Sequence, residues 1–304
     1  MMNETRPLPR SAVLIVNAQS RKGRRLFREA CIRLEAGGIT LIAAYAVRQP
    51  KRMGPHIRDA IAAGAPMVIV GGGDGSLSSA VDHFVGADTV FALLPFGTAN
   101  SFARTLGIPL DLDGAIGVVT GGHRRRIDLG MIDADYFANF AAIGLSPLIA
   151  ETVPDPLKRV AGRLGYLGWA LFRIGKFRPI TLTVGEGAGA ETVDALEVRI
   201  ANGAYHGGAE LVANARVDSG DVIVQAVIGR QMRRLVWNYV RALFGLPQKA
   251  AEVREFRGRS LRIATDPPQP ISIDGEVLAH TPVTARIAAG VIEVAAPPSA
   301  QPEG

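Results

Sequence analysis

Hydrophobic and polar positions follow two different rhythms along the chain, and the change falls near residue 127. Before it, short apolar runs typical of buried strands alternate with longer runs of helical periodicity. The expected strands cover 12–17, 39–47, 67–70 and 89–94, and the expected helices cover 23–36, 53–63, 76–84 and 112–120. Such alternation is typical of a parallel sheet with crossover helices. The pattern therefore predicts an α/β domain over residues 1–127.

From residue 128 to 296 the apolar positions recur with a period of two, in short runs bounded by glycine, aspartate and proline. This pattern predicts a second domain built as a β-sandwich or barrel. Its expected strands include 196–201, 222–228, 260–264, 271–273 and 283–287. Two segments of helical periodicity, 157–177 and 231–244, carry basic residues opposite an apolar stripe. The stripe favours packing on a core with a solvated basic face, and contact with a membrane is the alternative. We expect the tail, 297–304, to be disordered.

Composition narrows the class of protein. The chain has 304 residues, of which 48% are hydrophobic, so it can bury a sizeable core. Its formal charge of +6 suits an anionic partner. The arginines are spread along the chain without interleaved aromatic residues, which disfavours nucleic acid and leaves an anionic membrane surface.

The compartment follows from cysteine usage and from the apolar runs. A single cysteine, Cys31, excludes an intramolecular disulfide, which is consistent with the cytoplasm. The first ten residues lack the apolar core of a signal peptide, and no stretch approaches the roughly 18 apolar residues of a membrane span. Membrane contact is therefore expected to be peripheral, at the inner face. An exposed edge of the sandwich would also allow a homodimer.

The strongest candidate for chemistry is the run Val-Ile-Val-Gly-Gly-Gly-Asp-Gly-Ser over 68–76, where a strand passes into a helix. Glycines remove side chains where a ligand would approach the backbone, and the following helix start favours anions. Asp74 would repel a bare polyphosphate, so it indicates a metal ion or a substrate hydroxyl at the same place. The structural alternative is that Asp74 or Ser76 simply caps the helix. Neither a GxGxxG nor a Walker pattern fits.

Two further loops have similar double interpretations. After the strand at 89–94, Thr98 and Asn100 offer uncharged polar groups that suit a phosphate or a base edge, although Thr98 could merely cap the next helix. Near the end of the chain, Asp274-Gly275 has the spelling of a hairpin turn. A plain turn is the structural interpretation, and the functional one makes Glu276 a general base.

Taken in order, these segments resemble one family. The matching segments are 13–17, 72–76, 95–100, 102–104, 127–130, 139–144 and 274–276. Together they resemble the diacylglycerol kinase catalytic-domain family, which includes bacterial lipid kinases and sphingosine and ceramide kinases. The glycine-aspartate-glycine loop alone is shared with NAD kinases and phosphofructokinases.

The resemblance implies an ATP-dependent lipid kinase that uses Mg²⁺, with an α/β nucleotide-binding domain followed by a β-sandwich domain. By motif position, Glu276 would take the proton from the lipid hydroxyl and Asp74 would help to position Mg²⁺ or the reacting groups. The implied ATP-binding residues are Asn17, Gly72, Gly73, Asp74, Gly75, Ser76, Leu77, Ser78, Gly97, Thr98 and Asn100. A structural metal site is implied at Asp218. Phosphoryl transfer depends on positioning and charge neutralisation, which agrees with this set.

The chain departs from the family pattern at several positions. Arg21 stands where the family's first loop, Asn-Pro-x-Ser-Gly, has its glycine, and Lys22 follows it; Ser101 stands where an aspartate is usual. Ser219 replaces the second acid of the Asp-Asp-Gly metal loop. These departures keep two other functions open, a kinase of a soluble substrate such as NAD and a non-catalytic nucleotide- or lipid-binding protein.

Overall fold

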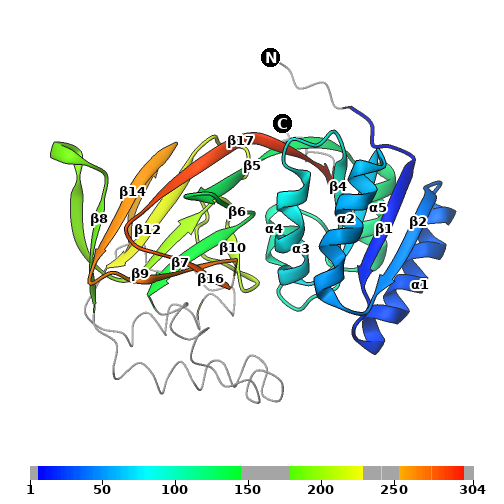
Figure 1. The fold of residues 1–304 in the computed structure, drawn as a ribbon, viewed down its shortest axis with the longest axis horizontal. Helices are drawn as coiled ribbons and strands as arrows, with labels where there is room; N and C mark the ends of the chain where they lie inside the picture. Colours follow the sequence, from blue (N-terminus) through cyan, green and yellow to red (C-terminus); the bar gives the residue numbers. More distant parts are fainter. Residues whose placement is uncertain (1–5, 145–178, 229–240, 242–252, 275, 298–304) are drawn as a thin grey trace. The chain divides into compact units, whose positions relative to one another are not determined.

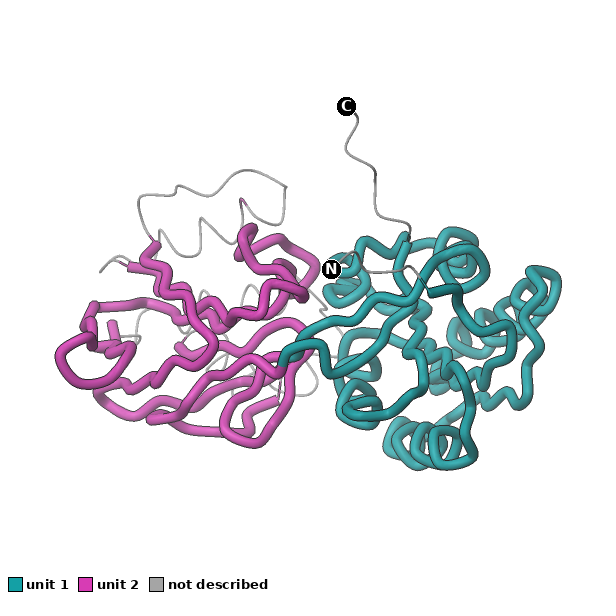
Figure 2. Tube along the Cα trace, turned by 90° about the horizontal axis from the view of Figure 1, so that it is seen from above, with its two compact units in different colours: residues 1–129, 289–304 teal, residues 130–288 magenta. Residues whose placement is uncertain are grey.

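The computed structural model describes residues 6–144, 179–228, 241, 253–274 and 276–297, and the chain divides into two compact units (Figure 1; Figure 2). Unit 1 comprises Met1–Leu129 and Ala289–Gly304, and unit 2 comprises Gly130–Ala288. The helices predicted over 157–177 and 231–244 lie outside the described residues except for Arg241. The predicted tail lies outside them beyond residue 297.

Unit 1 contains a parallel sheet in the strand order β4-β3-β1-β2, which confirms the predicted α/β architecture (Figure 1). Its strands are β1 (Ser11–Asn17), β2 (Thr40–Val47), β3 (Met67–Gly72) and β4 (Val90–Pro95). Every residue of β3 and β4 is buried, as expected for parallel strands with helices on both faces. The apolar runs that predict these strands therefore reflect burial on both faces.

The helices of unit 1 begin close to where the sequence predicts them. They are α1 (Arg21–Ala36), α2 (Met53–Ala62), α3 (Asp74–Val81), α4 (Ser101–Thr105) and α5 (Leu112–Gly121), with 3₁₀ turns η1 (Pro50–Arg52) and η2 (Asp82–Phe84). In α1 the Ser20 side chain accepts a hydrogen bond from the Gly23 N–H at 2.9 Å. In α5 the Asp111 side chain caps the Gly114 N–H at 2.8 Å. Both are side-chain caps that satisfy unpaired amides of the first turn.

The last strand of the chain differs from the sequence prediction. Sequence analysis assigns 128–296 to one sandwich domain, whereas β17 (Val283–Ala296) passes from unit 2 into unit 1 at Ala289. Its first residues pair with β14 of unit 2, and Val294 pairs in parallel with Phe91 of β4. A hydrophobic period of two indicates a strand but not the sheet that the strand joins. The sequence pattern therefore does not predict that β17 passes into unit 1.

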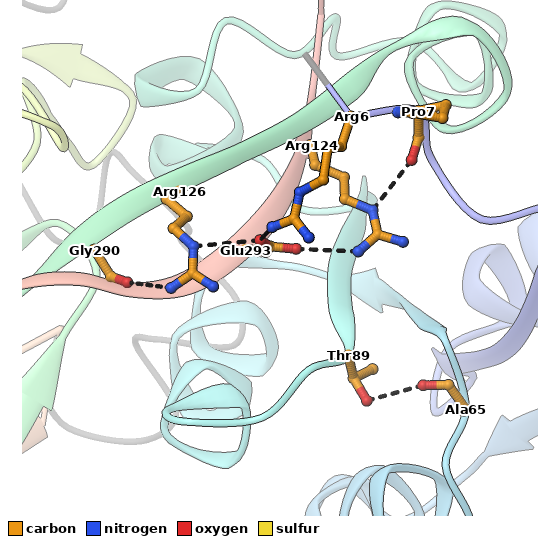
Figure 3. A network of polar contacts seen from close by, with 8 residues as sticks. All are labelled: Arg6, Pro7, Ala65, Thr89, Arg124, Arg126, Gly290 and Glu293. Carbon is orange, nitrogen blue, oxygen red and sulfur yellow. Dashed lines mark hydrogen bonds and ion pairs between the residues drawn. The ribbon is translucent and has the colours of Figure 1, made fainter. Parts of the chain in front are cut away.

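A buried carboxylate fixes the returning strand within unit 1 (Figure 3). Glu293 of β17 is paired with Arg6, with Arg124 Nη1 at 3.3 Å and with Arg126 Nε at 3.3 Å. The Arg126 guanidinium also donates to the Gly290 carbonyl at 3.2 Å. A buried carboxylate is tolerated when charged donors surround it, as they do here. Three distant segments, the N-terminal stretch, β5 (His123–Ile132) and β17, are thereby joined.

In unit 2, the pairings among strands β6 to β16, and those of β6 with β5 and of β14 with β17, are antiparallel within the described residues. Besides parts of β5 and β17, its strands are β6 (Asp135–Phe137), β7 (Phe140–Gly144), β8 (Ile180–Val184), β9 (Glu191–Ala201), β10 (Tyr205–His206), β11 (Ala209–Glu210), β12 (Val222–Ile228), β13 (Val253–Gly258), β14 (Ser260–Asp266), β15 (Pro270–Ile273) and β16 (Glu276–His280), with one 3₁₀ turn, η3 (Gly187–Gly189). Their order includes the path β16-β15-β7-β9-β8-β14-β17. This arrangement confirms the predicted β-sandwich domain.

Two apolar clusters lie on opposite faces of β7, β9 and β12. Ala141 and Ile143 of β7 belong to the larger cluster, whereas Phe140 and Ala142 belong to the smaller one. Alternate side chains of a strand point to opposite faces, so β7 is buried on both. For this reason its sequence, Phe-Ala-Ala-Ile-Gly, does not alternate between apolar and polar residues.

The described residues contain no helix that is long and apolar enough to cross a membrane.

Candidate active site

Three loops of unit 1 meet at the carboxyl ends of β1, β3 and β4. The strands are in register, with Val13 opposite Val68 and Val70 opposite Leu93, so their ends share one edge of the sheet. A pocket of about 370 Å³ lies at this edge, within the size range of small-molecule sites. It is lined by Asn17, Gln19, Ser20, Lys22, Gly23, Gly72, Gly73 and Phe96.

The glycines of the loop after β3 are required by close packing. A Cβ added to Gly72 would lie 2.6 Å from the Ser76 side chain, and one added to Gly71 would lie 2.8 Å from the Phe96 ring. The Cβ of a residue at Gly97, in the neighbouring loop, would lie 2.7 Å from the Gly73 Cα. The two loops therefore touch backbone to backbone. Gly75 differs, because a Cβ there would meet nothing within 4 Å and would point into open space.

Asp74 joins the two loops through its carboxylate. It is the first residue of α3, whose N-cap is Gly73, and it makes no capping bond to its own helix. Its Oδ2 instead accepts a hydrogen bond from the Asn100 N–H at 2.8 Å, and its Oδ1 accepts one from the Ser101 N–H at 2.5 Å. These are the first amides of α4, so Asp74 caps a helix that begins 27 residues later. Its carboxylate still has acceptor capacity, because each oxygen has two lone pairs.

Asn100 closes the second loop on itself. Its backbone is left-handed, with a φ of 50°, a conformation that asparagine tolerates better than most residues. Its Oδ1 accepts from the Gly97 N–H at 2.9 Å, and its Nδ2 donates to the Gly97 carbonyl at 3.0 Å. Between Gly97 and Asn100, Thr98 is exposed at the tip of the loop.

The first loop is tied to the glycine loop through Asn17, whose Nδ2 donates to Ser76 Oγ at 3.0 Å. Lys22 and Gly23 follow in the first turn of α1 and line the pocket. A Cβ at Gly23 would lie 2.5 Å from the Asn17 carbonyl, so this turn too needs a glycine. The structure thus brings Asn17, Gly72, Gly73, Asp74, Ser76, Gly97 and Asn100 together. Leu77 is buried in α3 and Ser78 follows it, while Gln19, Ser20, Gly23 and Phe96 also line the pocket.

Glu276 lies in unit 2, at the first position of β16, and it is exposed. It pairs with Ile273 across a two-residue turn in which Asp274 has a φ of 46°, as the predicted hairpin requires. The Asp274 carboxylate leaves the turn and accepts hydrogen bonds from the Ala138 N–H at 3.1 Å and the Phe140 N–H at 3.3 Å. The turn that presents Glu276 is therefore anchored to the segment before β7.

Asp218, the predicted structural metal ligand, lies in the turn before β12. Its carboxylate is 4.0 Å from the Arg216 guanidinium. Ser219 closes the same turn by donating from Oγ to the Arg216 carbonyl at 3.0 Å. Within the part of the chain that the structure describes, no three His, Cys, Asp or Glu side chains are grouped to hold a metal ion. A metal role for Asp218 therefore stays a prediction.

Unit 2 contains a group of buried polar side chains on β9 and β12. Arg199 of β9 donates to Gln225 Oε1 of β12 at 2.9 Å and lies 3.4 Å from Glu197 Oε1. His206 stacks on Phe140 with 4.5 Å between ring centroids. Burial of the imidazole, together with the nearby Arg199 charge, lowers the pKa of His206 to about 4. His206 is therefore neutral near pH 7.

Comparison with known proteins agrees with this architecture. Residues 11–132 match the diacylglycerol kinase catalytic domain, and residues 141–296 match the YegS C-terminal NAD kinase beta sandwich-like domain. The second match alone covers more than half of the chain. The chain belongs to the YegS-like lipid kinase family. The predicted resemblance is thereby confirmed.

Individual members of this family are similar over most of their length. A protein of Escherichia fergusonii named "probable lipid kinase YegS" is 32% identical over 220 residues, which cover 69% of this chain and 72% of that protein. One of Salmonella typhimurium with the same name is 29% identical over 301 residues, covering 95% and 96%. A crystal structure titled as a diacylglycerol kinase from Bacillus anthracis has a TM-score of 0.74 at 19% identity and covers 98% of this chain and 99% of that chain. At that identity the likeness shows a shared fold.

Proposed function

We propose that this family member transfers the γ-phosphoryl group of ATP to a hydroxyl of a membrane lipid, diacylglycerol or a related alcohol. The observation that carries the proposal is the 370 Å³ pocket next to the loops that Asp74 clamps together. Phosphoryl transfer needs charge neutralisation and fixed geometry, and this edge of unit 1 has backbone amides, a lysine and two helix starts. We also propose that the enzyme acts in the cytoplasm as a peripheral protein at the inner membrane face, where its lipid substrate lies.

In this proposal the pocket holds the phosphates of ATP. The N–H of the exposed residue Gly75, in the first turn of α3, and the Lys22 ammonium offer donors to phosphate oxygens, whereas the Ser76 and Leu77 amides donate to the Gly73 carbonyl. Thr98 is exposed at the tip of its loop and free to hydrogen-bond with the nucleotide. Asn17 and Asn100 have their amides engaged within the protein, so they shape the pocket through the loops that they hold.

The Asp74 carboxylate fits Mg²⁺, because Mg²⁺ in such enzymes is bound by one or two carboxylates together with substrate phosphates and water. Asp74 retains acceptor capacity beyond its two amide bonds, whereas Ser101, in the position of the usual second acid, offers a hydroxyl. When bound, the ion would supply positive charge that offsets the charge of the transferring phosphoryl group. The role of Asp74 within this chain is to fix α4 against the glycine loop.

Glu276 is the proposed general base. As a carboxylate it can accept the proton of the attacking lipid hydroxyl while that oxygen bonds to the γ-phosphorus of ATP and the bond from this phosphorus to ADP breaks. It is exposed at the start of β16, on a turn anchored by Asp274, so its backbone is fixed while its side chain can reach a substrate.

The proposal is tested by following radiolabel from γ-labelled ATP into diacylglycerol, phosphatidylglycerol and sphingoid lipids in mixed micelles. We expect label in at least one lipid, and a roughly 10²- to 10⁴-fold loss of turnover in Glu276→Gln with ATP affinity retained. Glu210→Gln, which changes another exposed glutamate of unit 2, serves as the matched control. Label transferred to NAD instead would assign a soluble acceptor. Calorimetric ATP binding without transfer to any acceptor would identify a non-catalytic nucleotide-binding protein.

A further inference from the structure

The positive charge of this chain is concentrated in two short segments, 17–28 and 47–58. Together they hold nine of the 34 arginine and lysine residues and none of the 28 aspartate and glutamate residues. The rest of the chain holds 25 basic and 28 acidic residues, so it is net negative although the whole chain is +6. The surplus of basic residues therefore lies in these two segments. The nine residues are Arg21, Lys22, Arg24, Arg25, Arg28, Arg48, Lys51, Arg52 and Arg58.

The fold brings the two segments together at one edge of unit 1. The first contains the start of α1, and the second begins at the last residue of β2, which ends the sheet order within the described residues. The Ala18 N–H donates to the Val47 carbonyl at 2.8 Å, and α1 packs on β2 (Figure 1). We call the nine basic residues of these segments the basic edge. Like charges so close together favour the binding of an anionic partner.

The basic edge is exposed, and acids of the protein neutralise little of its charge. Eight of its nine residues are exposed, and Arg24 is half-buried. Within the described part of the chain, Arg25 pairs with Glu29 at 3.4 Å and the other eight make no ion pair. Arg254 of unit 2, by contrast, is exposed and pairs with Glu191 at 2.8 Å. The charge of the basic edge is therefore available to an anion outside the protein.

ATP in the proposed pocket accounts for a small part of this charge. Lys22 lines the 370 Å³ pocket, whereas the other eight residues of the basic edge, all of them described, lie outside its lining. The basic edge therefore extends well beyond the proposed nucleotide site and suits a larger anionic surface.

Exposed apolar side chains lie beside the basic edge. Ile42 of β2 is 58% exposed. Tyr45, which is 40% exposed, stacks on His56 of the second segment with 4.5 Å between ring centroids. Tyrosine is common at membrane interfaces, because its ring is apolar and its hydroxyl stays in water. Basic residues next to exposed apolar ones are typical of surfaces that bind anionic lipids.

We propose that the basic edge docks unit 1 onto the surface of an anionic phospholipid bilayer, through the attraction of its cations to the lipid phosphates. This inference deepens the proposed function and rests on it, because a kinase of a membrane lipid has to reach a bilayer surface. Each basic residue near such a surface adds to the affinity, and dissolved salt weakens the attraction.

The test is sedimentation of the full chain with vesicles, in the absence of ATP and of an acceptor lipid. We expect binding to vesicles of three parts phosphatidylcholine and one part phosphatidylglycerol that weakens as NaCl is raised, and little binding to phosphatidylcholine alone. The variant combines Arg48→Gln, Lys51→Gln and Arg52→Gln, at positions outside the lining of the ATP pocket. Its affinity for the anionic vesicles should fall roughly 10- to 100-fold, because each basic residue at such a surface contributes about fivefold.

Two controls match this variant. Combining Arg254→Gln, Arg257→Gln and Arg259→Gln removes the same charge from exposed positions on and next to β13, and should lower the vesicle affinity less than about threefold. Combining Arg48→Lys with Arg52→Lys keeps the charge of the basic edge and should bind vesicles as the wild type does. The melting temperature and the calorimetric affinity for ATP should stay unchanged when Arg48, Lys51 and Arg52 become glutamine.

Several results would overturn the inference. Wild-type protein that binds anionic vesicles no better than neutral ones, or a glutamine variant that binds them as tightly as the wild type, would exclude the basic edge as the docking surface. Lower ATP affinity with unchanged vesicle binding would assign these cations to the nucleotide. Tighter binding to a fluorescent DNA or RNA duplex than to vesicles, lost in the variant, would assign them to nucleic acid. The proposed function fails separately, when the wild type labels no lipid, because vesicle binding is measured without phosphoryl transfer.

Discussion

Asp74 and Asp274, one in each unit, both precede a glycine, and both use the two oxygens of the carboxylate to accept backbone amides of a distant segment. They reach this from different backbones. Asp74 starts a helix, whereas Asp274 sits in a hairpin turn with a φ of 46°. Identical dipeptides thus serve a helix start and a turn, and in both places the aspartate side chain leaves its own element to hold another.

We call each of these aspartates, with the two amides that it accepts, a clamp. The Asp74 clamp and the Asp274 clamp hold different segments. The Asp74 bonds, at 2.8 and 2.5 Å, are shorter than those of Asp274, at 3.1 and 3.3 Å. Asp74 joins loops that contact one pocket, so it controls the proposed ATP side. Asp274 joins a turn that carries Glu276 to the segment before β7, so it controls the proposed lipid side. The comparison predicts that damage to one clamp should spare the function of the other.

Asp74→Asn should have the largest effect. An amide has one oxygen where the carboxylate has two, so either the Asn100 or the Ser101 amide loses its acceptor. We expect the free energy of unfolding to fall by about 3 kcal/mol. The affinity for ATP, measured by calorimetry, should fall at least tenfold because the loops beside the pocket separate. If the variant loses stability but binds ATP normally, Asp74 has a structural role only.

Asp274→Asn should cost less, about 2 kcal/mol of unfolding free energy in urea denaturation, because its hydrogen bonds are longer. Lipid turnover should fall roughly 100-fold, since small displacements of catalytic groups have effects of this size. The affinity for ATP should remain that of the wild type. Weaker ATP binding in this variant would show that the two clamps do not act separately.

The sequence predicted the parts of both clamps but neither connection. Glycines at 71–75 and the apolar run before them mark a strand-to-helix turn, and the spelling Asp-Gly marks a hairpin, because both are local requirements of the backbone. The bond from Asp74 to Ser101 spans 27 residues, and the bond from Asp274 to Ala138 spans 136. The periodicity of hydrophobic positions gives no information about contacts between residues so far apart in the sequence.

The structure decides two alternatives that the sequence leaves open, because it shows which residues cap helices α3 and α4. Asp74 does act as a helix cap, but for α4 and not for its own helix. Thr98 does not cap α4, whose N-cap is Asn100. Strand β7 is buried on both faces, so its sequence is a short apolar run without alternation. Catalytic and ATP-binding roles remain predictions that depend on the experiments.

The pH dependence of stability should distinguish the two clamps, because His206 stacks on Phe140, a residue that the Asp274 clamp holds. The pKa of His206 is lowered from 6.5 to about 4 by burial and by Arg199. Below pH 6.5 the unfolded chain therefore binds a proton at His206 that the folded chain does not. As the pH is lowered from 6.5 towards 4, the free energy of unfolding decreases.

We expect His206 to reduce the free energy of unfolding by up to about 2 kcal/mol between pH 7 and pH 5. His206→Phe keeps a ring against Phe140 and removes the titration, so it should lose less stability over this range. Urea denaturation of both proteins at the two pH values gives the comparison. Equal losses in wild type and variant would mean that other groups cause the pH dependence.

Gly75→Ala should change stability least and therefore tests the Asp74 side most cleanly. A Cβ at Gly75 meets no atom within 4 Å, and alanine favours a helix, so the free energy of unfolding should stay the same or rise by up to about 1 kcal/mol. Gly97→Ala is the contrasting variant, because its Cβ would lie 2.7 Å from the Gly73 Cα and should cost about 1–3 kcal/mol. If phosphate approaches the start of α3, the methyl group of Gly75→Ala should weaken ATP binding roughly tenfold without harming the fold. Unchanged ATP affinity would instead move the phosphates to the Lys22 side of the pocket, away from the residue that follows Asp74.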